Sequence, residues 1–178
     1  IKVTPLDFIA KALVSALKEF PNFNASLNPE SNKIIYKKYF HIGFAVDTPH
    51  GLMVPKLRNV DKMSIQKIGE ELKNTSQLCR ELKIDKKEFF GGSMTISSLG
   101  GIGGTHFTPI INPPEVAILG VGRTFDRLVK EKNQIVSKKI LPISLSYDHR
   151  LIDGAEGARF CVYLGKCLGK DFAFKLAV

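Results

Sequence analysis

The feature that most restricts the fold is an apolar segment that joins a helix through a short polar loop. Residues 140–147 are rich in apolar side chains, a pattern typical of a strand buried on both faces. Residues 154–168 are predicted to form the last helix, and the loop between them places His149 between Asp148 and Asp153. A buried strand that leads directly into a helix requires a sheet with helices packed against it.

The other predicted elements follow from local patterns. A capping hydroxyl at Thr4, followed by a proline and a one-sided apolar face, predicts a helix over residues 5–20. Apolar spacings of three and four predict a second, amphipathic helix from Ile65 to Leu82, with Asp61 or Ser64 as its N-cap. Runs of β-branched and aromatic residues predict the remaining strands at residues 34–36, 39–46, 52–54, 94–99 and 116–121.

The order of these elements determines the expected fold class. Helix, strands, helix, strands and helix follow one another without the regular alternation of a doubly wound parallel sheet. The length of 178 residues and the hydrophobic content of 44% fit one domain with a real core. We therefore expect a single α/β (α+β) domain, residues 1–178, in which helices cover a mixed β-sheet.

Charge and hydropathy restrict the partners. No apolar run approaches the roughly 20 residues that span a bilayer, and the start of the chain lacks a signal-peptide pattern, so we expect no membrane association. The net charge of +9 suits polyanions such as nucleic acid, anionic peptides or phosphorylated ligands. The basic residues are spread singly or in pairs, however, so we expect a solvated surface and no nucleic-acid partner.

Cysteines and scattered histidines give no sign of a metal site. The three cysteines are Cys79, Cys161 and Cys167, and none belongs to a zinc-binding motif. We expect three buried free thiols and a reducing compartment. The three histidines outside the polar loop, His41, His50 and His106, have no metal-like spacing, and we interpret them as structural or exposed.

His149 is the best candidate for a general base. Its imidazole titrates near pH 7 and can remove a proton from a thiol or a hydroxyl. Asp148, Arg150 and Asp153 concentrate charge around it, although a purely structural loop histidine is the alternative. Asp153 also has a second interpretation, because residues 153–156 form a capping-box pattern for the last helix. Capping and support of an active site are compatible.

Ser97 and Ser98 lie where a predicted strand runs into a glycine-rich loop, residues 99–104. Four glycines permit a ligand to approach the backbone closely. Their spacing matches neither the dinucleotide-binding fingerprint nor the phosphate-binding loop of nucleotide hydrolases. A ligand-binding loop and a tightly turned structural loop both remain open.

These motifs resemble a known family. HRLIDG at residues 149–154 has the H-x-x-x-D-G pattern of CoA-dependent acyltransferases, including chloramphenicol acetyltransferase. The segments DHRLIDGAEGARF, FTPIINPPEVAILGVG, MTISSLGGIGG and IGFAVDTPHGLMVP resemble the catalytic domain of dihydrolipoyl acyltransferases, the core component of 2-oxo acid dehydrogenase complexes. The chain is most similar to the acetyltransferase branch of pyruvate dehydrogenase complexes, and SYDHRLIDG also resembles the succinyltransferase branch. The resemblance implies a two-layer, chloramphenicol acetyltransferase-like fold.

The resemblance also implies roles for particular residues. His149 would be the base, Ser97 would donate a hydrogen bond to the oxyanion, and Asp153 would support the site. Asp47, Ser97 and Ser98 would contact CoA. In the implied reaction His149 deprotonates a thiol of dihydrolipoamide or CoA, and the sulfur attacks the acyl thioester. Coenzyme A, acetyl-CoA and a lipoyl group on a separate domain are the implied substrates, with no covalently bound cofactor.

The assembly implied by the resemblance is a homotrimer in which the histidine of one subunit lies beside the serine of its neighbour. Such trimers would build a cubic core that works with lipoyl domains, a decarboxylase and dihydrolipoyl dehydrogenase, in bacterial cytoplasm or mitochondrial matrix. The chain is expected to lack an N-terminal segment of the catalytic domain, the lipoyl domain and the subunit-binding domain. Residues 172–178 have an apolar pattern, Phe172, Phe174, Leu176 and Val178, that suits an intertrimer contact or ordinary core packing.

Other functions remain alternatives. A succinyl- or branched-chain acyltransferase would use the same motifs, and a non-catalytic structural core would share the assembly. A hydrolase using Ser97, His149 and Asp153 is disfavoured, because the serine lacks a nucleophile elbow. A basic nucleic-acid binder is supported only by net charge.

Overall fold

The computed structural model describes residues 3–28, 30 and 32–169. Its centre is a five-stranded sheet in the order β11-β8-β7-β3-β6. The strands are β3 (Ile42–Phe44), β6 (Lys56–Leu57), β7 (Met94–Ser98), β8 (Ala117–Val121) and β11 (Ile143–Tyr147). β7 runs parallel to β3 and β8, whereas the edge strands β6 and β11 are antiparallel to their neighbours. The predicted mixed sheet is therefore confirmed.

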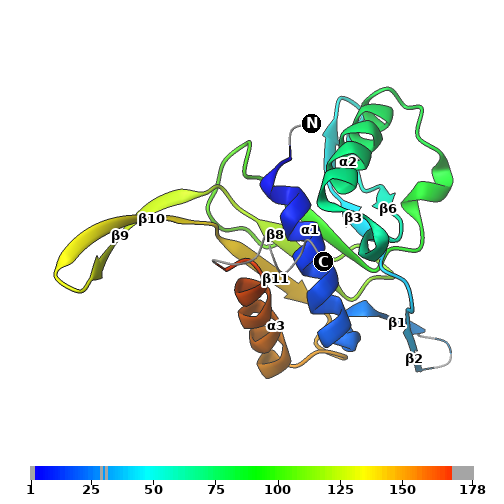
Figure 1. Ribbon diagram of the computed structural model, residues 1–178. Coiled ribbons are helices and arrows are strands. Elements are labelled where there is room, and N and C mark those ends of the chain that lie inside the picture. Colours follow the sequence, from blue (N-terminus) through cyan, green and yellow to red (C-terminus); the bar gives the residue numbers. More distant parts are fainter. Residues whose placement is uncertain (1–2, 29, 31, 170–178) are drawn as a thin grey trace.

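Three α-helices lie in a row over this sheet, with α1 in the middle (Figure 1). They are α1 (Pro5–Glu19), α2 (Ile65–Arg80) and α3 (Gly154–Cys167). Short 3₁₀ helices occur at Pro21–Asn24, Val60–Lys62 and Lys86–Phe89. The core lies between the two layers, where Leu13 and Leu17 of α1 are buried together with Ile42, Ile96 and Leu119 of the central strands.

The helix ends have identifiable local causes. The Thr4 N–H donates to Asp7 Oδ2 at 2.6 Å in the first turn of α1. Of the two caps predicted for α2, Ser64 is the one used, since its Oγ accepts from the Lys67 N–H at 3.2 Å. α2 ends two residues before the predicted end because Leu82 has a φ of 55°, which is incompatible with a right-handed helix.

Three two-stranded ladders complete the described structure. They are β1 (Ala25–Asn28) with β2 (Lys33–Tyr36), β4 (Val46–Thr48) with β5 (Gly51–Met53), and β9 (Phe125–Glu131) with β10 (Gln134–Ile140). The β9–β10 hairpin projects away from the body of the molecule (Figure 1). Sequence patterns did not predict β1, β6, β9 or β10.

Two strand predictions were wrong in detail. Residues 39–46 are not one strand, because β3 ends at Phe44 and β4 begins at Val46, with Ala45 donating to the Ile96 carbonyl at 3.0 Å. β8 is fully buried as predicted, but every residue of β11 is only half-buried, because β11 is the edge strand. The predicted strand start at Ile140 instead belongs to β10.

The three cysteines are not equally buried. Cys79 is buried, but Cys161 and Cys167 are partly exposed on α3, so the expectation of three buried thiols was wrong for two of them.

The described residues contain no helix that is both long and apolar enough to span a membrane. The apolar tail at residues 172–178 lies outside the described residues.

Candidate active site

The loop that carries His149 is held to the beginning of β8. The Asp148 N–H donates to the Val116 carbonyl at 2.8 Å, which extends the β11–β8 ladder by one bond. The Asp148 carbonyl then accepts from the N–H groups of Leu151 and Ile152, both at 3.0 Å. Ile152 is completely buried, whereas His149 is exposed. A rigid turn thus presents an accessible imidazole.

An ion pair and a hydrogen bond between Asp148 and Arg150 stabilise this turn. The Arg150 guanidinium binds both carboxylate oxygens of Asp148, with its shortest contact at 2.6 Å, and the Arg150 N–H donates to Asp148 Oδ1 at 3.0 Å. Hydrogen bonds from Arg150 lower the pKa of the Asp148 carboxyl. Asp148 therefore stays ionised at neutral pH and organises the loop backbone.

Asp153 is the N-cap of α3. Its Oδ1 accepts from the Glu156 N–H at 2.7 Å, so the capping interpretation is confirmed. The other half of the predicted capping box differs, because both Glu156 carboxylate oxygens accept from Asn22 Nδ2 at 3.1 Å. This contact ties the first turn of α3 to the segment that follows α1.

Ser97 lies on β7, opposite Gly120 of β8. His149 instead follows Tyr147, which lies opposite Ala117 at the other end of β8. Gly120 is three residues beyond Ala117, a separation of about 10 Å along a strand before the further offset of His149 is added. One chain therefore does not bring the predicted base and the predicted oxyanion donor together.

Ser98 and part of the glycine-rich loop line a cavity of about 650 Å³. Gly100 and Gly101 contribute to its wall, and so does Arg123, a cation that sequence patterns had not singled out. Arg123 lies two residues after the end of β8, and its N–H donates to the Gly104 carbonyl at 2.8 Å. The sequence feature that could have identified Arg123 is its position in a loop after a buried strand, because such loops often carry functional residues.

The rest of the glycine loop has a conformational explanation. Gly103 and Gly104 have φ values of 151° and 84°, which favour glycine. Gly100 and Gly101 instead line the cavity, and the prediction that this part of the loop binds a ligand stays a prediction.

Asp47 is exposed on β4, opposite Leu52 of β5. The neighbouring Thr48 organises the turn of this hairpin, because its hydroxyl donates to the Gly51 carbonyl at 2.7 Å and accepts from the His50 N–H at 3.1 Å. Asp47 is therefore carried by a defined hairpin with its side chain accessible.

Two remaining histidines have distinct environments. His41 Nδ1 accepts from the Asn59 N–H at 3.0 Å, and burial together with nearby Arg58 lowers the pKa of its imidazole. This supports its structural interpretation. His106 lines a second cavity of about 290 Å³ with Ser144 and Ser146 of β11.

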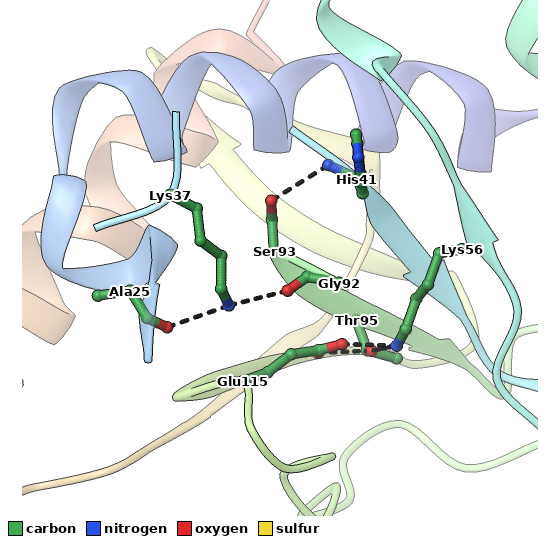
Figure 2. A network of polar contacts seen from close by, with 8 residues as sticks. All are labelled: Ala25, Lys37, His41, Lys56, Gly92, Ser93, Thr95 and Glu115. Carbon is green, nitrogen blue, oxygen red and sulfur yellow. Dashed lines mark hydrogen bonds and ion pairs between the residues drawn. The ribbon is translucent and has the colours of Figure 1, made fainter. Parts of the chain in front are cut away.

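A buried ion pair involves Glu115, which lies in the segment immediately before β8. Sequence patterns did not predict this pair. Lys56 Nζ contacts Glu115 Oε1 at 2.5 Å, and both side chains are only 1% exposed. Figure 2 shows Thr95 hydrogen-bonded to this pair, and Lys37 nearby, hydrogen-bonded to Ala25 and Gly92. The partners are separated by 59 positions, so no local pattern could have paired them.

Comparison with known proteins gives a consistent result. The family model described as 2-oxoacid dehydrogenases acyltransferase (catalytic domain) matches residues 1–173. The dihydrolipoyllysine-residue acetyltransferase component of the pyruvate dehydrogenase complex from Cupriavidus necator is 52% identical over 172 residues, which is 97% of this chain and 31% of that protein. The Haemophilus influenzae component of the same name is 51% identical over 94% of this chain and 30% of that protein. The chain thus spans about a third of these relatives.

Solved structures agree with this similarity. The dihydrolipoamide acetyltransferase of Azotobacter vinelandii has a TM-score of 0.93 and 47% identity, covering 97% of this chain and 71% of that chain. The cubic core of a pyruvate dehydrogenase multienzyme complex also has a TM-score of 0.93, with 48% identity and the same coverage. A chloramphenicol acetyltransferase has a TM-score of 0.60 at 13% identity, covering 92% and 77% of the respective chains, which confirms the expected fold.

Proposed function

The chain belongs to the 2-oxoacid dehydrogenase acyltransferase family, whose catalytic-domain model matches residues 1–173, and we propose that it transfers an acetyl group between dihydrolipoamide and coenzyme A. One observation carries the proposal. The Azotobacter structure was determined to study a serine, a histidine and an asparagine in the catalytic mechanism, with the serine 52 residues before the histidine and the asparagine four residues after it. Ser97, His149 and Asp153 have the same spacing.

In the proposed mechanism His149 is the general base. Its exposed imidazole takes the proton from the thiol of dihydrolipoamide, and the sulfur attacks the carbonyl carbon of acetyl-CoA. Collapse of the tetrahedral intermediate breaks the carbon–sulfur bond to CoA, and the proton on His149 passes to the departing thiolate. The acetyl group moves directly from sulfur to sulfur, and the reverse reaction uses the same steps. General-base catalysis of this kind contributes about 10²–10⁴ in rate.

The proposed role of Ser97 is to donate its hydroxyl hydrogen to the oxygen that becomes negative in the tetrahedral intermediate. A donor held in place for that oxygen contributes about 10²–10³ in rate. Since Ser97 and His149 are at opposite ends of the central strands, the site would combine Ser97 of one subunit with His149 of its neighbour. This requirement supports a homotrimer as the functional unit.

Substrate contacts and support follow from the positions of the other predicted residues. Asp153 would support the site by fixing the start of α3, which follows the His149 loop. Asp47 and the pair Ser97 and Ser98 would contact CoA, and Ser98 and Arg123 both line the cavity at the end of β8. Arg123 supplies a positive charge that suits the phosphates of CoA.

The proposed biological setting is the core of a pyruvate dehydrogenase complex in bacterial cytoplasm. A lipoyl group on a separate domain would deliver the acetyl group, and the decarboxylase and dihydrolipoyl dehydrogenase would be the partner enzymes. Support comes from the bacterial relatives named for this complex and from the similarity to a cubic core.

Competition between acyl donors tests the proposed specificity. Intact protein is incubated with dihydrolipoamide and equal concentrations of acetyl-CoA, succinyl-CoA and isobutyryl-CoA, and the acylated products are quantified by mass spectrometry. We expect acetyl-dihydrolipoamide to predominate. Predominance of either other product would replace the acetyl assignment while retaining the family.

A further inference from the structure

Two strands and the segment before β8 contribute to one buried polar cluster, defined here as the Lys56 cluster: Lys56, Thr95 and Glu115. Lys56 Nζ donates to Glu115 Oε1 at 2.5 Å and to Thr95 Oγ1 at 3.2 Å. The Thr95 hydroxyl donates to Glu115 Oε2 at 2.6 Å. Figure 2 shows the three side chains converging between β6, β7 and the segment before β8. Each carboxylate oxygen of Glu115 therefore has its own donor.

The surrounding backbone leaves room for this cluster. A Cβ on Gly43 of β3, the strand between β6 and β7, would lie 2.4 Å from Thr95 Oγ1 and 2.7 Å from Lys56 Nζ. A Cβ on Gly92 would lie 2.3 Å from Glu115 Oε1. Two glycines thus occupy the positions where any side chain would collide with the charged groups.

A second lysine, Lys37, forms hydrogen bonds close to the Lys56 cluster. Lys37 Nζ donates to the Gly92 carbonyl at 2.8 Å and to the Ala25 carbonyl at 3.2 Å (Figure 2). Burial lowers the pKa of Lys37 to about 8, while the negative charge of Glu115 acts in the opposite direction. Glu115 is therefore an electrostatic partner of two lysines from different parts of the chain.

Stability alone is a poor explanation for a buried ion pair. Desolvation of two charges offsets much of their attraction, and well-packed apolar residues of similar volume serve the core as well or better. What such a pair adds is a defined position, because each charged group must meet its partner. We therefore expect the ion pair to fix the position of the chain around Glu115.

Glu115 immediately precedes Val116, the residue whose carbonyl is hydrogen-bonded to the His149 loop. The Glu115 N–H donates to the Asn112 carbonyl at 3.0 Å. The Val116 carbonyl accepts the Asp148 N–H at 2.8 Å, and Asp148 carries the turn that contains His149. A single peptide unit therefore separates the buried carboxylate side chain from the hydrogen bond that anchors the candidate base.

We propose that Glu115, held by Lys56 and Thr95, is a positioning residue for His149. The Lys56 cluster fixes the peptide of Val116, and that peptide fixes the turn at Asp148. The catalytic meaning of this arrangement rests on the proposed function, whereas the mechanical coupling of the cluster to the loop does not. The two parts are separable by experiment.

Thr95 offers a matched pair of variants. Thr95→Val removes the hydroxyl that donates to Glu115 and keeps the shape of the side chain, whereas Thr95→Ser retains the hydroxyl. Ser93→Ala is the control for a general loss of buried polar contacts. Ser93 Oγ accepts from the His41 N–H at 3.1 Å and donates to the Tyr39 carbonyl at 3.0 Å, and neither partner belongs to the Lys56 cluster.

Amide hydrogen exchange in the intact protein measures the coupling directly. We expect Thr95→Val to raise the exchange rate of the Asp148 amide about tenfold relative to that of Leu119, a core amide of β8 that serves as the reference for global opening. Thr95→Ser and Ser93→Ala should leave this ratio unchanged. Equal ratios in Thr95→Val and Ser93→Ala would overturn the proposal.

Steady-state kinetics tests the catalytic part. Thr95→Val should lower kcat about tenfold with the KM for CoA unchanged, and Thr95→Ser should restore kcat. A changed exchange ratio with unchanged kcat would overturn the positioning role in catalysis. If the unmodified protein had no transferase activity, the proposed function would fail, and the exchange ratio alone would decide the mechanical coupling.

Discussion

Ser97 and His149 lie at opposite ends of the central strands of the same chain. Ser97 is opposite Gly120 of β8, whereas the residue two positions before His149, Tyr147, is opposite Ala117. In the proposed reaction the proton acceptor and the oxyanion donor must both reach one thioester. The proposed site would therefore combine Ser97 of one subunit with His149 of its neighbour.

Subunit mixing tests this requirement. We expect Ser97→Ala protein and His149→Ala protein to be nearly inactive alone and to regain activity when they are unfolded, mixed in equal amounts and refolded together. In random trimers about one quarter of the sites would pair an intact serine with an intact histidine. The measurement is acetyl transfer, expressed as a fraction of the activity of wild-type protein refolded in the same way.

The matched control mixes Ser97→Ala protein with the double variant Ser97→Ala/His149→Ala, because this mixture contains no intact serine. It should remain inactive. Failure of the complementing mixture to exceed this control, with trimers present, would contradict a site shared between subunits.

Asp153 is expected to act mainly as a helix cap. Asp153→Ala should lower the free energy of unfolding by about 1 kcal/mol, because the Glu156 N–H loses its acceptor. Asp153→Asn should keep both stability and activity, since asparagine caps helices as well as aspartate does. The Azotobacter relative also has an asparagine four residues after its histidine. Urea unfolding and kcat of the two variants would check this, and inactivity of a stable Asp153→Asn protein would show that the charge itself is needed.

Lys37 should make stability depend on pH above neutrality. Burial lowers its pKa from 10.5 to about 8 in the folded state, so between these values the unfolded chain binds more protons. The contribution of Lys37 to the free energy of unfolding therefore rises as the pH increases from about 8 to 10.5. Relative to Lys37→Met, wild-type protein should gain stability between pH 7 and pH 10 in urea unfolding.

Lys38→Met is the control for this titration, because Lys38 is an exposed neighbour. Its stability difference from wild type should stay constant over the same pH range. A constant difference for Lys37→Met as well would contradict the buried environment of Lys37.

Local sequence patterns predicted the parts of the fold whose causes are local. The Thr4 and Ser64 helix starts, the buried strand β8 and the Asp153 cap depend on neighbouring residues, and the structure contains all of them. The His149 loop was recognisable because a polar turn lies between a strand and a capped helix. The family resemblance then added roles that no spacing alone specified.

Some missed features depend on residues far apart in sequence, and the local β9–β10 hairpin lacks a pattern that marks it. β11 has an apolar pattern but lies at the sheet edge, and its place is determined by pairing with β8 alone. The β9–β10 hairpin is predominantly exposed and has no clean apolar alternation. Lys56 and Glu115 each resemble an ordinary surface residue, and only the fold brings them together.

The most direct test of the proposed function is the initial rate of acetyl transfer from acetyl-CoA to dihydrolipoamide by the intact protein, compared with its His149→Ala variant. We expect steady formation of acetyl-dihydrolipoamide by the wild type and a fall in kcat of about 10²–10⁴ in the variant, with the trimer retained. An unchanged kcat in a correctly assembled His149→Ala protein would contradict the role of His149 as the general base.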